Sequence, residues 1–218
     1  MHLRFGAPPF SADFAPDSSW NLLREPSLLL SQLIALPIGV ITAGAIAVLW
    51  YSVTPLQDAQ FSKTWWPYVL LYLGLCVIHE LVHTVPQPLA GGSEHSFVGF
   101  WPKYGVFYAH YDGELSRNRF VVILLMPVLL LSVLPLVVAA VLHSSSCWVA
   151  TISCLNALLT CVDLLVAGLV LFQVPASASV RNQGWRTYWR EHEHRSRRSC
   201  TPPVPPEARA GAGTGHGG

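Results

Sequence analysis

Four long apolar segments constrain the fold of this chain more than any other feature of its sequence. They cover residues 27–51, 66–89, 120–142 and 147–172. Each is close to the roughly 20 residues that a helix needs to cross a bilayer, and each is too apolar on all sides for a surface helix. Only 11% of the 218 residues are charged, whereas a soluble domain usually has about a quarter of its residues charged. We therefore expect an all-α membrane protein with four transmembrane helices.

The basic residues lie outside these apolar segments and indicate how the chain is oriented. Apart from Lys63, they all lie in the N-terminal arm, in the loop between the second and third segments, and in the C-terminal tail. Because cytoplasmic loops are enriched in Lys and Arg, both termini are expected in the cytoplasm. We expect a multi-pass protein of a prokaryotic plasma membrane that contacts lipid. The net charge of +1 gives no information about nucleic acid, and no nucleic-acid partner is expected.

Composition divides the chain into a cytoplasmic arm (1–26), a membrane domain (27–174) and a tail (175–218). The tail is rich in Arg and then in Pro and Gly, so it is expected to be disordered. Around a Pro-Lys-Tyr-Gly turn, the loop between the second and third segments predicts a small β-hairpin with strands 96–101 and 105–111. This hairpin could anchor aromatic side chains at the membrane interface, or pair through a strand edge with an extended peptide.

Polar side chains inside the apolar segments indicate a functional site. Glu80 and Asp163 are the acidic residues within them, and a carboxylate at the bilayer centre costs about 2.5 kcal/mol or more. His79 and His83 lie four residues apart, which places both imidazoles on one face of a helix. In this His-Glu-x-x-His pattern the two histidines bind zinc and the glutamate activates the zinc-bound water. Pro86 should help to end the helix just past the motif.

A catalytic zinc also needs a third protein ligand, and Asp163 is the best candidate. Counted from the extracytoplasmic ends of their segments at 1.5 Å per residue, Asp163 lies about 24 Å deep and the two histidines about 20–26 Å deep. The three side chains therefore match in depth. Asn156 and Thr160 share the helical face of Asp163, and His110 lies in the loop near the cytoplasmic mouth. These last three residues could bind substrate or orient a ligand.

Residues 66–172 resemble a zincin peptidase family of four-helix membrane proteins, which is similar in logic to the site-2 proteases. The resemblance rests on four stretches: HELVH (79–83), FWPKYGVFYAHYDGELSRNRF (100–120), Met126-Pro127 and NALLTCVD (156–163). It implies that His79, His83 and Asp163 bind Zn²⁺ and that Glu80 is catalytic.

The leading hypothesis is an intramembrane zinc metallopeptidase that hydrolyses a peptide bond of a peptide or membrane-protein substrate. A first alternative is a non-enzymatic scaffold with a structural metal site, in which Cys76 would complete a closed set of four ligands. A second alternative is a transporter that uses Glu80 and Asp163 as an ion or proton relay. The transporter is disfavoured because the sequence shows no inverted repeat.

Overall fold

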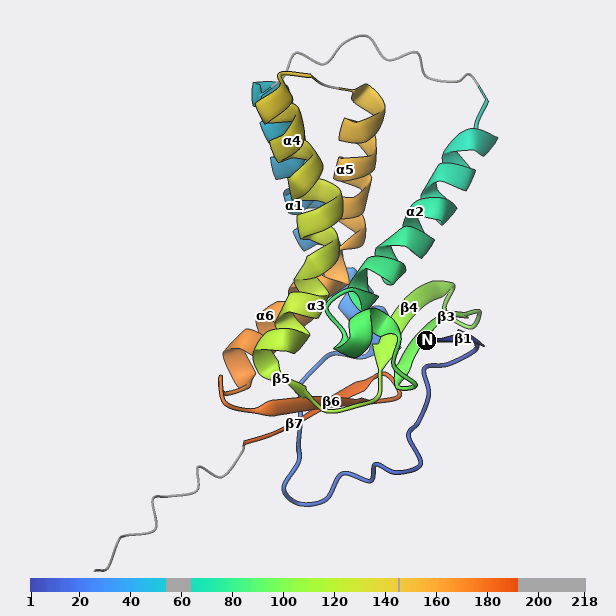
Figure 1. Cartoon of the computed structure of the whole chain (residues 1–218), viewed down its shortest axis with the longest axis vertical. Helices are drawn as coiled ribbons and strands as arrows, with labels where there is room; N and C mark the ends of the chain where they lie inside the picture. The colour runs from blue at the N-terminus through green and yellow to red at the C-terminus, as the bar shows by residue number, and fades with distance from the viewer. Residues whose placement is uncertain (54–63, 145, 192–218) are drawn as a thin grey trace, which may run out of the picture.

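The computed structural model of this chain describes residues 1–53, 64–144 and 146–191. Helices form one end of the molecule, and two small β-sheets form the other, near the ends of α2, α3 and α6 (Figure 1). The sheets draw their strands from the N-terminal arm, from the loop between the second and third apolar segments, and from the residues that follow the fourth.

The helices follow the predicted apolar segments, with two interruptions. Three of the helical segments are long and apolar enough to cross a membrane, and a fourth would be the pair α5 and α6, bent by 47° at a break. The expectation of four transmembrane helices is therefore confirmed only in part. The helices are α1 (Leu28–Val53), α2 (Trp66–Thr84), α3 (Arg117–Pro127), α4 (Leu134–Leu142), α5 (Cys147–Leu159) and α6 (Cys161–Gln173), with a π-helical turn η2 (Val128–Val133) joining α3 to α4.

Local features mark both interruptions. Pro127 and Pro135 flank η2, and each removes a backbone donor from the helix. At the second interruption, Thr160 has left helical geometry, with a ψ of 4°. Its hydroxyl donates to the carbonyl of Asn156 four residues earlier. The bend brings Asp163 into the first turn of α6.

The expectation of an all-α fold with one small hairpin is wrong, because the described residues contain two sheets. In the first sheet, β1 (His2–Phe5) runs parallel to β3 (Ser96–Trp101), which pairs antiparallel with β4 (Val106–Tyr111). The predicted hairpin is thus confirmed, and β4 is an edge strand of this sheet. A short 3-10 turn, η1 (Pro88–Gly91), lies between α2 and β3.

The second sheet corrects the expectation for the C-terminal tail. Residues 175–190, expected to be disordered, contain β6 (Ser179–Gln183) and β7 (Arg186–Arg190), which form a hairpin. Gly184 in its turn has a φ of +60°, a conformation that glycine adopts without steric cost. The strand order is β2-β7-β6-β5, with β2 at Asn21–Leu22 and β5 at Leu115–Ser116. The rest of the predicted tail, residues 192–218, lies outside the described residues.

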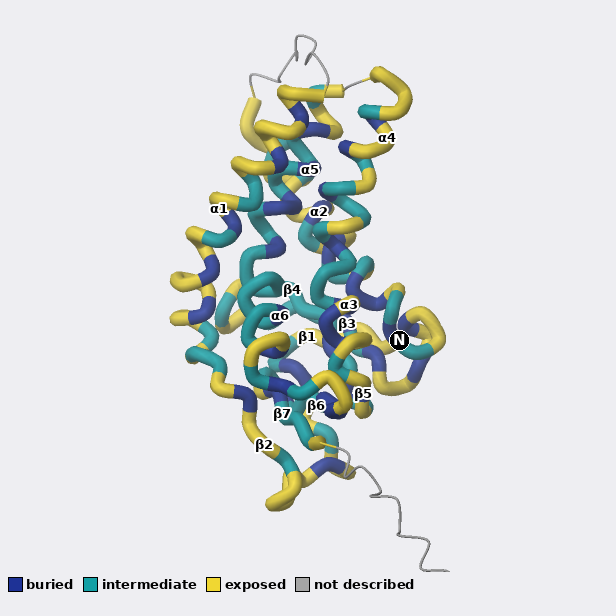
Figure 2. The backbone as a smooth tube through the Cα atoms, turned by 90° about the vertical axis from the view of Figure 1, so that its left-hand side faces the viewer, coloured by how far each residue is buried: buried dark blue, intermediate teal, exposed yellow. Residues whose placement is uncertain are grey.

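Two apolar clusters hold the elements together. One joins the second sheet to α3 and α6 through residues such as Leu115, Phe120, Val170 and Val180. The other packs α1, α4 and α5 around Trp50. Beyond these clusters, the helical end exposes long stretches of its chain (Figure 2). Large apolar side chains are exposed along α1, α2 and α4, which is the kind of surface that lipid would cover.

Candidate metal centre

The two histidines of the motif lie in the last turns of α2. This helix begins with Pro67 in its first turn and ends at Thr84, just before Pro86, as the sequence predicts. His79 and His83 are both only 5% exposed. Their ring centroids are 5.0 Å apart, because residues four apart lie on one helical face.

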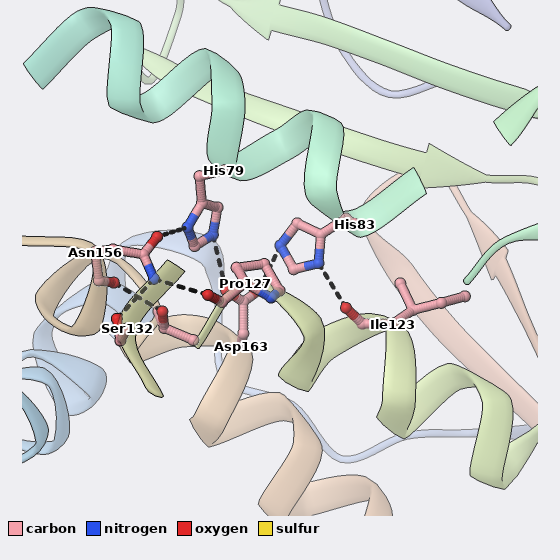
Figure 3. A network of polar contacts seen from close by, with 8 residues as sticks. His79, His83, Ile123, Pro127, Ser132, Asn156 and Asp163 are labelled. Atoms are coloured by element: carbon pink, nitrogen blue, oxygen red, sulfur yellow. Dashed lines mark hydrogen bonds and ion pairs between the residues drawn. The ribbon is translucent and has the colours of Figure 1, made fainter. Parts of the chain in front are cut away.

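Asp163 approaches the two histidines from α6, as Figure 3 shows. Its Oδ2 lies 3.1 Å from Nε2 of His79, and its Oδ1 lies 3.5 Å from Nε2 of His83. One ligand atom from each of the three residues falls within 4.8 Å of the other two. The structure therefore brings together the three side chains that spacing and depth predict as metal ligands.

Hydrogen bonds fix which nitrogen of each imidazole can bind a metal. Nδ1 of His83 lies 2.7 Å from the carbonyl oxygen of Ile123. A carbonyl only accepts, so this nitrogen carries the proton and donates. Nδ1 of His79 lies 2.9 Å from Oδ1 of Asn156 and donates to it by the same reasoning. In a neutral imidazole the other nitrogen, Nε2, is then unprotonated, and in both histidines Nε2 is the nitrogen that faces Asp163.

The orientation of the Asn156 amide is set by its other partners. Its Nδ2 donates to the carbonyl of Pro127 and to the hydroxyl of Ser132, each at 2.9 Å. The Ser132 hydroxyl donates in turn to the carbonyl of Ser153, while the Ser153 hydroxyl donates to the carbonyl of Ser132 and accepts from Nε1 of Trp50. Asn156 is fully buried. A continuous polar network therefore runs from His79 through α5 and η2 to α1.

The donor set fits a divalent metal ion. When both imidazoles are neutral, their Nε2 atoms and the Asp163 carboxylate present only lone pairs to the space between them, and these repel one another unless a cation lies there. Ligands on a tetrahedral zinc are about 3.4 Å apart, close to the 3.1 and 3.5 Å separations found here. Cys76 is not a member of this group within the described part of the chain. A tetrahedral zinc held by these three residues alone would have a fourth position for water or substrate, as in catalytic zinc sites.

Glu80 lies between the ligands and the edge strand β4. Its carboxylate lies near the backbone N–H of Ala109. Since β3 pairs with the other side of β4, this N–H belongs to the free edge of the strand. A cavity of about 580 Å³ borders Glu80, the three ligands and the whole of β4.

The other residues predicted for the site lie near it in different roles. Thr160 is fully buried and bonds its own helix, at the break between α5 and α6, so it forms part of the backbone support of the site. His110 on β4 is 5% exposed and lines the cavity. Burial lowers the pKa of His110 to about 4. Within the described residues its Nε2 has no hydrogen-bond partner.

Sequence reasoning missed several groups that orient the ligands. Ser132 carries a weak signal, since it is a polar residue in the third apolar segment. The carbonyls of Ile123 and Pro127 carry none, because every residue has a carbonyl. Sequence reasoning also missed Glu25, which lines the cavity without orienting a ligand. It was missed because it lies in the N-terminal arm, far from the motif in sequence.

Comparison with known proteins adds one finding. A family model described as "Putative zincin peptidase" matches residues 72–179. The matched range contains the His-Glu-x-x-His motif, the hairpin and Asp163. No curated protein and no solved structure matches the chain. The resemblance found from the sequence motifs is thereby confirmed.

Proposed function

Because residues 72–179 belong to the zincin peptidase family, we propose that this chain is a membrane-embedded zinc metallopeptidase that hydrolyses a peptide bond. One observation carries the proposal. The Nε2 atoms of His79 and His83 meet the Asp163 carboxylate, and Glu80 of the same helix lies beside them. Zinc held by these three ligands would supply a Lewis acid for a water molecule and for the substrate carbonyl.

Glu80 is the proton carrier of the proposed reaction. Its carboxylate accepts a proton from the attacking water and then donates it to the nitrogen of the leaving amine. Glu80 and the nearby Ala109 of β4 both line the cavity. Asn156 and the carbonyl of Ile123 keep the two imidazoles in the tautomer that binds metal through Nε2.

The free edge of β4 supports a peptide rather than a small molecule as the substrate. An extended peptide that pairs with this edge gains backbone hydrogen bonds independent of its sequence. The same edge carries the Ala109 N–H that reaches Glu80. A backbone carbonyl of the paired peptide would therefore lie beside the general base.

The placement in a membrane follows from the same features. The apolar helices lie at one end, and the sheets, with most of the described arginines, lie at the other. Basic segments remain in the cytoplasm, which supports a site at the cytoplasmic end of α2, where the first turn of α6 meets it. A structural metal scaffold is less well supported, since the ligand group has three members in the described part of the chain and a closed structural zinc site has four.

Glu80→Gln tests the proposal directly. The purified variant in detergent should keep its zinc, measured by elemental analysis, because Glu80 is not a ligand. It should lose cleavage of a mixed peptide library by at least about 100-fold, measured by mass spectrometry. Glu94→Gln is the control, since Glu94 is an exposed carboxylate outside the cavity. Full cleavage by Glu80→Gln, or no zinc in the unmodified protein, would contradict the proposal.

A further inference from the structure

We propose that Glu25 binds a cationic group of the substrate, either the side chain of a lysine or arginine or the N-terminal ammonium group. The inference rests on the proposed peptidase function and names a property of its substrate. Glu25 would select substrates by their charge without taking part in the reaction, because it lies in the same cavity as the metal centre but outside it.

Glu25 lies in the short segment between β2 and α1. Its Oε1 accepts a hydrogen bond of 3.0 Å from the backbone N–H of Thr187 in β7. The side chain is half-buried and lines the cavity that also borders His79 and Glu80. Burial raises the pKa of Glu25 to about 7.

The charges around the cavity leave this carboxylate without a counter-ion. Three acidic residues line the cavity, and two of them, Glu80 and Asp163, belong to the metal centre. Among the described residues that line it there is no Lys or Arg. Arg186 is near enough to lower the pKa of Glu25 slightly, but its guanidinium stacks on the ring of Trp185. No ion pair between described residues includes Glu25.

A carboxylate in this setting is costly unless a cation joins it. Removing a carboxylate from water without a partner destabilises the protein by several kcal/mol at full burial and by less at half burial. The bond to Thr187 does not require the charge, because a glutamine oxygen would accept from the same N–H. The negative charge of Glu25 is therefore available to bind a cationic ligand.

The walls of the cavity fit a cation on a long apolar stem. Trp101, Tyr108 and Trp185 line it, and aromatic faces attract ammonium and guanidinium groups. Apolar walls also accommodate the methylene stem of a lysine or arginine. Since β4 borders the cavity along its length, a peptide paired with that strand could direct a side chain or its own N-terminus toward Glu25.

Binding to an inert form of the protein tests the inference separately from cleavage. The full chain with Glu80→Gln, loaded with zinc in detergent, is titrated into fluorescent peptides of alanine and valine. These differ only in a central lysine, arginine, norleucine or glutamate. One series has an acetylated N-terminus, and a second series has norleucine at the centre and a free N-terminus, with anisotropy as the readout.

We expect a peptide with a cationic group to bind roughly tenfold more tightly than the acetylated norleucine peptide. Adding Glu25→Gln should reduce this ratio to near one, while adding Glu94→Gln should leave it unchanged. Preference for the acetylated lysine or arginine peptides identifies the side chain as the cation, and preference for the free N-terminus identifies the ammonium group. Equal binding of all peptides, binding of none, or a cation preference that survives Glu25→Gln would overturn the inference. Absence of cleavage by the unmodified protein would instead count against the peptidase proposal.

Discussion

Replacing Asn156 by leucine should separate the metal ligands from the network that orients them. Asn156 is fully buried and makes three hydrogen bonds, to Nδ1 of His79, to the carbonyl of Pro127 and to the hydroxyl of Ser132. Leucine has a similar size but no polar atom. The change therefore removes the partner of His79 without touching Nε2, which faces Asp163.

The expected magnitude follows from these contacts. Each hydrogen bond contributes about 1 kcal/mol net, so the loss of three should lower the free energy of unfolding by about 3 kcal/mol. Loss of the group that orients a metal-binding histidine typically weakens metal affinity by roughly 10–100-fold. Asn156→Asp is the matched variant, because it keeps an oxygen to accept from Nδ1 of His79 and loses the two donors to Pro127 and Ser132. It should lose stability but hold zinc nearly as tightly as the unmodified protein.

The two variants need two measurements. Zinc affinity is measured in detergent by competition with a chromophoric chelator, and stability by thermal unfolding of the metal-free protein. The reasoning fails if Asn156→Leu binds zinc as tightly as the unmodified chain. It also fails if Asn156→Asp binds zinc as weakly as the leucine variant, because the acceptor would then not be what orients His79.

Two further predictions concern stability against pH, with opposite signs. The pKa of Glu25 is about 7 in the folded protein against an ordinary value of 4.5, so the unfolded chain releases its proton first as pH rises through this window. Stability from this group should then fall by up to about 3 kcal/mol, and Glu25→Gln should remove that fall when melting temperatures are compared across the window. The pKa of His110 is about 4 when folded against 6.5, so the unfolded chain binds a proton first as pH falls. Acidification should cost up to about 3 kcal/mol, and His110→Phe should remove that loss; an unchanged slope in either variant would contradict the burial that shifts the pKa.

The sequence predicts the parts of the fold that depend on local patterns. Long apolar segments identify the helices, the Pro-Lys-Tyr-Gly turn identifies the β3–β4 hairpin, and Pro86 helps to locate the end of α2. The two sheets could not be predicted in the same way. β1 pairs with a strand some ninety residues later, as His2 opposite Phe97 shows, and no local pattern reports such a partner. β6 and β7 contain several arginines, and this composition led to the prediction of a disordered tail instead of two strands.

The candidate site, like the fold, could be predicted only where it depends on patterns within the sequence. His79, His83 and Asp163 could be proposed together because spacing on one helix and depth along two helices are both properties of the sequence. The break at Thr160 could not, since no glycine or proline marks it. Backbone groups such as the carbonyl of Ile123 and the N–H of Ala109 complete the geometry. They have no signature in the amino-acid sequence.

The bend between α5 and α6 has a mechanical consequence. It makes α6 a separate rod, whose first turn meets α2 through Asp163 and His79, residues 84 positions apart in the chain. An ion held by both would act as a cross-link between the two rods. Closing a loop of that length costs the unfolded chain about 4.6 kcal/mol of conformational freedom. A metal ion held by these residues would therefore be a tether between α2 and α6 as well as a reagent.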